Sequence, residues 1–173
     1  MRLLLLILCI PYTLFAELKL PDNFQANFTQ KITNSKNKVI NYSGKVSFSE
    51  HINFKWSYKE PSLKEVCTNG MELVVVDHDL EQVSNYVITK GINIAKILQQ
   101  ATLHSKNIYV ANHENKLYTI QVNQKGSLHS IAYFDDLDNK VQIVFTQMNY
   151  GKGALDKQKM YCDHPADYDM IRG

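Results

Sequence analysis

The feature that most constrains this chain is the period of two in its apolar side chains. In the stretch NFKWSYKEP, residues 53–61, Phe54, Trp56 and Tyr58 alternate with lysine and serine. Successive side chains of a β-strand point to opposite faces, so this alternation predicts a strand with one apolar and one solvated face. Three aromatic rings on one side of a strand can fill a sealed core or line a cavity, and periodicity alone leaves both interpretations open.

The same alternation recurs along most of the chain. We expect further strands within residues 24–32, 41–49, 64–70, 71–77, 80–88, 106–112, 116–124, 128–135, 140–150 and 159–163. Asn69-Gly70 is a strong hairpin signal between two of them. An antiparallel sheet of nine to eleven strands has to twist and curl to manage its edges. The sequence therefore predicts a mainly β protein built as a barrel, open or closed.

A later segment departs from the period of two. Ile94, Ile97, Leu98 and Ala101 recur at spacings i, i+3, i+4 and i+7. This spacing predicts one face of a short amphipathic helix, and Asn93 is a suitable N-cap. The apolar face of a lone helix has to be buried, and the mouth of the barrel is a suitable place.

The first sixteen residues predict a secretory signal peptide. Arg2 precedes the uncharged run LLLLILCIPYTLF, and Ala16 is a small residue at the expected cleavage site. A lipoprotein anchor at Cys9 is disfavoured, because the small residue that normally precedes a lipidated cysteine is missing. Residues 17–173 are then expected to form a single domain.

Two cysteines, Cys67 and Cys162, remain after the expected cleavage. Export places them in an oxidising compartment. An even pair of cysteines in an exported chain favours a disulfide, and two buried free thiols are the alternative.

The sequence carries none of the common catalytic motifs. It has no phosphate-binding glycine loop, nucleophile elbow or zinc-protease motif, and its six histidines are scattered. The formal net charge is +2, and no basic stripe marks a nucleic-acid surface. We therefore expect no enzyme activity, catalytic residue, cofactor, metal ion or nucleic-acid partner. A binding protein is expected, and an apolar pocket is one interpretation of the aromatic strand.

Five segments, each weak alone, form a specific set through their order and spacing. They are FQANFTQKI at 24–32, GKVSF at 44–48 with FKWSYKEP at 54–61, NGMELVVVDHDLEQV at 69–83, NIAKIL at 93–98, and GALDKQKMYCDHPADYDMI at 153–171. Together they resemble the LolA family of periplasmic lipoprotein carriers over nearly all of the mature chain.

The resemblance implies an unclosed, half-open antiparallel β-barrel of about nine to eleven strands with a short helical lid. It implies a hydrophobic cavity for the acyl chains of lipoproteins, with wall residues Phe28, Val46, Phe48, Phe54, Trp56, Tyr58, Leu73 and Val75. Val74 and Val76 remain the alternative to Leu73 and Val75. The lid would be formed by Ile94, Ile97, Leu98 and Ala101.

The resemblance also implies partners. Members of the family take triacylated lipoproteins released from the inner membrane by an ATP-driven ABC transporter. They carry the lipoproteins across the periplasm to the outer membrane, often through a lipidated receptor. We expect a monomer that uses no ATP itself. The alternatives are a general periplasmic carrier of lipid and the lipidated outer-membrane receptor, which has a similar fold.

Two departures from the family pattern concern the lid. Relatives commonly have an Arg-Pro pair before the aromatic strand, and the arginine helps to latch the lid. Glu50 and His51 stand there in this chain, and a glutamate cannot donate the hydrogen bonds of an arginine. Residues 17–23 replace the family's long first helix, so the lid is expected to rest mainly on residues 92–101.

Overall fold

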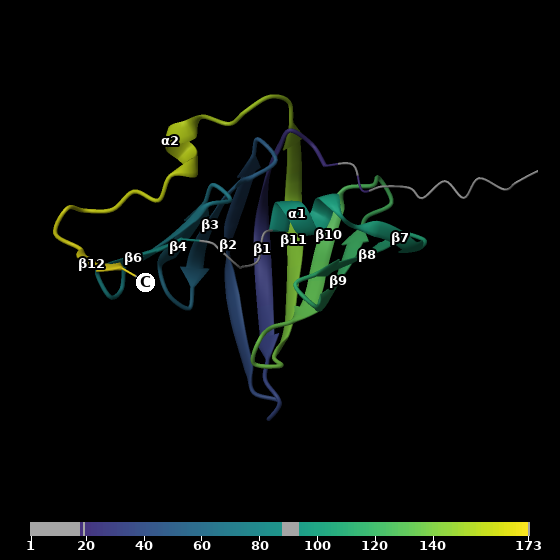
Figure 1. Ribbon diagram of the computed structural model, residues 1–173, viewed down its shortest axis with the longest axis horizontal. Helices are drawn as coiled ribbons and strands as arrows, with labels where there is room; N and C mark the ends of the chain where they lie inside the picture. The colour runs from purple at the N-terminus through teal and green to yellow at the C-terminus, as the bar shows by residue number, and fades with distance from the viewer. Residues whose placement is uncertain (1–17, 19, 88–93, 173) are drawn as a thin grey trace, which may run out of the picture.

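The computed structural model describes residue 18, residues 20–87 and residues 94–172, and contains one β-sheet with two short helices (Figure 1). The elements are β1 (Asn23–Thr33), β2 (Val39–Ser49), β3 (Asn53–Glu60), β4 (Lys64–Thr68), β5 (Glu72–Asp77), β6 (Gln82–Val87), α1 (Ile94–Gln99), β7 (Thr102–Ser105), β8 (Ile108–His113), β9 (Lys116–Val122), β10 (Leu128–Phe134), β11 (Lys140–Gly151), α2 (Lys157–Met160) and β12 (Asp169–Arg172). The expected signal peptide, Cys9 and Asn93 lie outside the described residues. In the part of the chain that is described, neither helix is long and apolar enough to cross a membrane.

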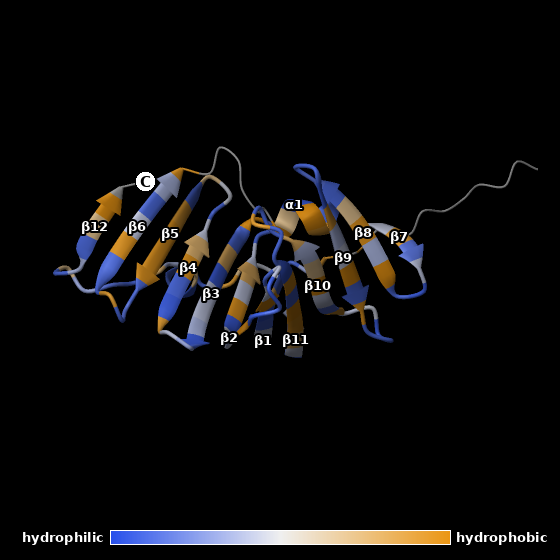
Figure 2. Cartoon of the chain, turned by 90° about the horizontal axis from the view of Figure 1, so that it is seen from below, coloured by the Kyte–Doolittle hydropathy of each residue, from blue (hydrophilic) through white to orange (hydrophobic). Residues whose placement is uncertain are grey.

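The twelve strands follow the order β12-β6-β5-β4-β3-β2-β1-β11-β10-β9-β8-β7. Strands β1 to β6 and strands β7 to β11 each form an antiparallel meander, and the pairing of β1 with β11 joins the two. Strand β12 pairs in parallel with β6. Figure 2 shows the sheet as an open arch with β12 and β7 at its two ends. The expected unclosed barrel is therefore confirmed, with twelve strands instead of nine to eleven.

The turn between β4 and β5 shows how local sequence sets the strand register. Gly70 has a φ of 85°, a conformation that costs glycine little. The side-chain oxygen of Asn69 accepts hydrogen bonds from the backbone N–H groups of Met71 and Glu72, both at 2.9 Å. The hairpin predicted from Asn69-Gly70 is confirmed, and it fixes which residues of β4 and β5 face each other.

Helix α1 lies in the hollow of the arch, on the concave side of the sheet (Figures 1 and 2), where it packs against β8. Ala95, Ile97 and Leu98 are buried, as is Ala101 just beyond the helix. These side chains join those of the concave face in one hydrophobic core. A six-residue helix is too short to be stable alone in water, so its contacts with the sheet hold it in helical form.

The strand predicted within residues 159–163 is wrong. Helix α2 occupies the start of this segment, and the side chain of Asp156 caps it by accepting a hydrogen bond from the backbone N–H of Gln158 at 3.0 Å. The helix packs against β2 and β3, and only its last residue, Met160, is buried. The final strand is instead β12, which extends the sheet edge at β6. Met160 and Cys162 therefore contact the convex side of the sheet. They do not belong to a strand that pairs with its edge.

The C-terminal segment crosses the convex side of the sheet between α2 and β12. Cys162 forms a disulfide with Cys67 of β4, so the cysteine pair favoured from the sequence is joined. Tyr168 lies further along the segment, and its hydroxyl is 3.2 Å from Nδ1 of His78. Val76 and Val83 face the convex side yet are buried, at 0% and 1% exposed. We infer that the C-terminal segment covers them.

Candidate functional site

The register of the sheet decides which side chains share the concave face. Residues directly opposite each other on neighbouring strands point to the same side. Trp56 of β3 lies opposite Val66 of β4, and Val66 lies opposite Val75 of β5. Leu73 is two residues before Val75, so it shares that face. Val74 and Val76 point to the convex side.

The aromatic side chains of β1, β2 and β3 pack closely on the concave face. The ring centroids of Phe48 and Phe54 are 4.7 Å apart, and those of Phe28 and Trp56 are 4.8 Å apart. Both distances lie within the range of favourable aromatic pairs. A Cβ atom on Gly44 would collide with the carbonyl of Ser57 and lie only 3.0 Å from the Phe28 ring. Glycine at this position therefore leaves room for the Phe28 ring next to β2.

The concave face has a covered part and a half-exposed part. Phe28, Val46, Phe48, Phe54 and Trp56 are buried in the same core as α1. Tyr58, Leu73 and Val75 are half-buried. Of the lid residues, Ile97, Leu98 and Ala101 are buried in this core and Ile94 is half-buried against it. The structure thus brings the lid residues into one core with most of the predicted wall, whereas Leu73 and Val75 lie on the same face outside this core. The role of these residues in holding acyl chains stays a prediction.

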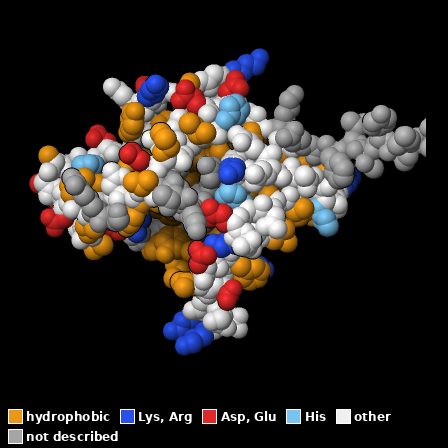
Figure 3. All heavy atoms as spheres, viewed as in Figure 1, with side chains coloured by type: hydrophobic (Ala, Val, Ile, Leu, Met, Phe, Trp, Pro, Cys, Tyr) orange, Lys and Arg blue, Asp and Glu red, His pale blue; other side chains and the backbone are white. Residues whose placement is uncertain are grey.

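The half-exposed part continues across β4, β5 and β6. Tyr86 of β6 lies opposite Leu73 and is 41% exposed. Figure 3 shows hydrophobic side chains gathered in a hollow near the centre of the molecule, on the concave side of the sheet. An apolar surface next to a buried apolar core is suited to an apolar ligand.

Polar groups gather at one end of this face. The Tyr58 hydroxyl donates a hydrogen bond to Oε1 of Gln30 at 3.2 Å. Nζ of Lys64 lies 3.0 Å from Oδ2 of Asp77. Tyr58, Lys64 and Asp77 are cross-strand neighbours on β3, β4 and β5. We call Gln30, Tyr58, Lys64 and Asp77 the polar rim. Its members come from four strands, so no local sequence motif could have identified it.

The ionisation of these groups follows from their surroundings. Burial, with a contribution from the neighbouring Tyr42, raises the pKa of Tyr58 to about 12. Burial also raises the pKa of Tyr133. Desolvation works against the ionised form of Asp77, but hydrogen bonds from Lys64 and from the backbone of Leu80 outweigh it and hold the pKa of the carboxyl below its usual value. At neutral pH the rim therefore presents the neutral hydroxyl of Tyr58 and the ion pair of Lys64 with Asp77.

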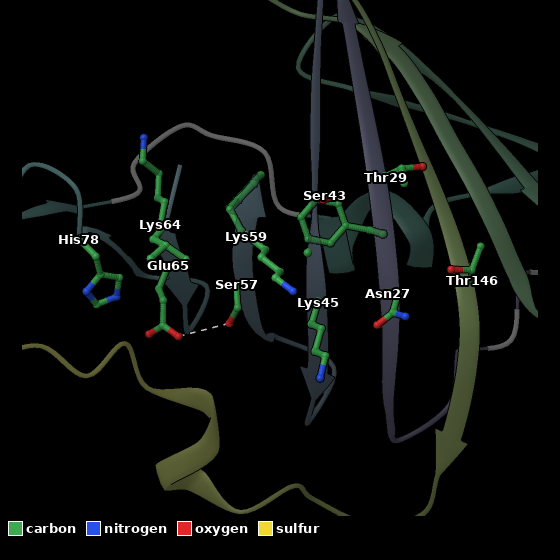
Figure 4. Close-up of a pocket in the computed structure, with 14 residues that line it drawn as sticks. Asn27, Thr29, Ser43, Lys45, Ser57, Lys59, Lys64, Glu65, His78 and Thr146 are labelled. Carbon is green, nitrogen blue, oxygen red and sulfur yellow. Dashed lines mark hydrogen bonds between the residues drawn. The ribbon is translucent and has the colours of Figure 1, made fainter. Parts of the chain in front are cut away.

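A second hollow lies on the opposite, polar face (Figure 4). It is an open groove of about 650 Å³. Its polar side chains come mainly from β11, β1, β2, β3 and β4 and are Asn27, Thr29, Ser43, Lys45, Ser57, Lys59, Glu65, His78 and Thr146. Lys64 also borders the groove, but its side chain points to the concave face, where it pairs with Asp77. Glu65 is bound there by Lys55 at 2.9 Å and by the Ser57 hydroxyl at 3.3 Å. Among the described residues, no group of three or more His, Cys, Asp or Glu side chains is placed to hold a metal ion. These side chains are the polar positions of the alternating strands, and they do not suit an apolar ligand.

Glu50 occupies the turn between β2 and β3, with a φ of 53°. Its carboxylate accepts a hydrogen bond from Nδ2 of Asn53 at 2.9 Å. It lines a small hollow with Lys157 and Met160 of α2. Glu50 therefore faces the C-terminal helix, and its hydrogen bonds are made within its own turn and with the backbone of Asp22.

Comparison with known proteins identifies the family of this fold. The model of a family described as "Outer membrane lipoprotein carrier protein LolA" matches residues 21–158. The chain belongs to the LolA family. An outer-membrane lipoprotein carrier protein of Campylobacter jejuni is 34% identical over 151 residues, covering 87% of each chain. Another, from Wolinella succinogenes, is 27% identical and covers 99% of each chain.

Solved structures agree with a LolA fold. A LolA superfamily protein from Nitrosomonas europaea aligns with a TM-score of 0.50 and 12% identity, covering 84% of this chain and 93% of the other. An uncharacterized conserved protein from Thermus thermophilus aligns with a TM-score of 0.57 and 10% identity, covering 89% and 92%. At these identities the likeness concerns the fold alone.

Proposed function

We propose that this protein is a periplasmic carrier that takes acylated lipoproteins from the inner membrane and delivers them to the outer membrane. The observation that carries the proposal is the concave face, where a short helix and an apolar sheet surface bury each other. Carriers with this name among the relatives support the same role. The proposed cargo is the triacylated cysteine of a lipoprotein, with its acyl chains against the concave face.

The energetics require such a cover. Three acyl chains of about fifteen carbons each, at ~0.8 kcal/mol per buried CH₂, would cost more than ~30 kcal/mol to expose fully to water. No spontaneous crossing of an aqueous space can overcome a cost of that size. A protein that shields the chains throughout the crossing removes most of this cost without any chemical step.

The lid has to open, and α1 is suited to opening. Its buried side chains, Ala95, Ile97 and Leu98, make apolar contacts in the core of the sheet. When acyl chains displace the helix, one set of apolar contacts on the sheet replaces another, so the net loss of burial at the sheet is small. A six-residue helix whose buried side chains make apolar contacts belongs to the parts of a fold that open most easily.

The proposed partners follow from this cycle. An ATP-driven ABC transporter in the inner membrane would release the lipoprotein to the carrier, because extracting acyl chains from a bilayer needs energy. The outer membrane, or a lipidated receptor in it, would accept the cargo. The carrier itself acts as a monomer, without ATP, cofactor or covalent bond.

The test is uptake of lipoprotein from inner-membrane vesicles by the mature protein in the presence of ATP. Lipoprotein that appears in the soluble fraction, bound to the carrier, is the expected result. Tyr86→Glu places a charge on the concave side of β6, whereas Val87→Glu places the same charge on the other side of the same strand. Uptake should fall with Tyr86→Glu and stay near wild type with Val87→Glu, because only the first charge enters the apolar surface. Uptake of free phospholipid without lipoprotein would instead favour a general lipid carrier.

A further inference from the structure

The concave face changes from apolar to polar along its strands. Three cross-strand rows on β3, β4 and β5 show the change, and they are Phe54–Thr68–Leu73, Trp56–Val66–Val75 and Tyr58–Lys64–Asp77. The first two rows are apolar except for Thr68, and the third belongs to the polar rim. Rows two residues apart are separated by about 7 Å along a strand, so the transition is abrupt.

The polar rim also has unused capacity for hydrogen bonds. The ammonium group of Lys64 has three donors, and its described ion pair is with Asp77. The Tyr58 hydroxyl donates to Gln30 and can still accept. The Lys64 side chain is 34% exposed, so its ammonium group can reach a ligand in the hollow.

We propose that the polar rim binds the ester and amide groups of the lipidated cysteine of the cargo, with the acyl chains directed away from the rim along the two apolar rows. This inference rests on the proposed function and adds the orientation of the cargo. The polypeptide of the lipoprotein then leaves at the end of the sheet formed by the turns at residues 34–38 and 61–63.

The chemistry of the two ends favours this orientation. Ester and amide carbonyls are hydrogen-bond acceptors, and the ammonium of Lys64 is a donor that can reach them. In the reverse orientation the carbonyls would lie beside Phe54 and Leu73 without charged donors, and the acyl ends would meet the ion pair of Lys64 and Asp77. A buried polar group left without a partner is costly, so the reverse orientation is disfavoured at both ends.

The first test compares two probes on matched variants. The probes are a synthetic lipopeptide, N-palmitoyl-S-dipalmitoylglyceryl-cysteine followed by one serine and four lysines, and the uncharged dye N-phenyl-1-naphthylamine. Lys64→Met keeps the apolar stem of the side chain and removes its donors, and Tyr58→Phe keeps the ring and removes the hydroxyl. Lys45→Met, on the convex face, is the control. We expect Lys64→Met and Tyr58→Phe to weaken lipopeptide binding about threefold to tenfold and to leave dye binding unchanged.

The sign of this effect separates hydrogen bonding from simple charge. Removing the positive charge of Lys64 reduces repulsion of the cationic lipopeptide, so electrostatics alone would strengthen binding. Equal lipopeptide affinity in Lys64→Met, Tyr58→Phe and wild type would overturn the rim as a binding site, while the carrier function would stand. Wild-type protein that binds the dye but not the lipopeptide would overturn the proposed function, and this inference with it.

The second test reads the orientation directly. A lipopeptide with a benzophenone on the residue after the lipidated cysteine is cross-linked to the wild-type protein by light, and the linked residues are mapped by mass spectrometry. We expect cross-links to residues 34–38 and 61–63. Cross-links to residues 69–71, at the opposite end of β4, would overturn the proposed orientation.

Discussion

The disulfide between Cys67 and Cys162 should contribute a large part of the stability, and Cys162→Ser tests this. The two cysteines are 95 residues apart in the sequence. In the chain-entropy model, closing a loop of that length destabilises the unfolded chain by about 4.7 kcal/mol. Measured effects of removing native disulfides are about 2–5 kcal/mol. We therefore expect Cys162→Ser to lower the free energy of unfolding by about 2–4 kcal/mol.

The assays are urea unfolding and thermal unfolding of the mature protein, each with and without a reductant. At about 2–4 °C per kcal/mol for a domain of this size, the melting temperature should fall by roughly 5–15 °C. The double variant Cys67→Ser/Cys162→Ser should match Cys162→Ser, which excludes an effect of the free thiol. Reductant should lower the stability of wild type only. If wild type has the same unfolding midpoint with and without reductant, the reasoning from loop closure is refuted.

Three further predictions concern single side chains. Gly44→Ala should destabilise the protein by about 1–3 kcal/mol, measured by urea unfolding, because the new methyl group collides with the Ser57 carbonyl and crowds the Phe28 ring. Because the pKa of Tyr58 is raised to about 12, its contribution to stability should persist up to about pH 10, the unfolded value, and be lost as the pH rises towards 12. Unfolding midpoints that show the same alkaline loss in Tyr58→Phe would contradict this. Glu50→Ala should leave lipoprotein uptake near the wild-type level, since the Glu50 carboxylate bonds only within its own turn among the described residues; a large loss would assign it a role in gating.

Patterns within single segments were sufficient to predict most elements. The alternation of Phe54, Trp56 and Tyr58 predicted β3 and its buried face, and the spacing of Ile97 and Leu98 predicted a helix that buries one side. These elements are determined by side chains that repeat with the period of the structure itself. The sequence could therefore indicate a curled sheet with one helix on it.

Features that depend on distant parts of the chain could not be predicted in this way. In LVVVD both alternate faces are apolar, because Val75 faces the concave side and Val76 is covered on the convex side. When both faces of a strand are apolar, alternation does not show which face lies on the concave side. The register of the β4–β5 hairpin determines it. The polar rim depends equally on register, since Lys64 and Asp77 become neighbours of Tyr58 only through strand pairing. Strand β12 was missed because its partner, β6, lies more than eighty residues earlier in the chain.

The pairing of β1 with β11 has a consequence for how the chain reaches its native form. Each meander consists of neighbouring hairpins and can form early, but Asn23 meets Gly151 and Thr33 meets Lys140 only after almost the whole chain is available. Contacts of such long sequence separation form slowly, since the loop-closure entropy must be overcome first. Until this seam closes, each half of the sheet exposes its apolar face without the other half or α1 against it. The interval before this seam closes is therefore the time at which this protein is most open to aggregation and to proteolysis.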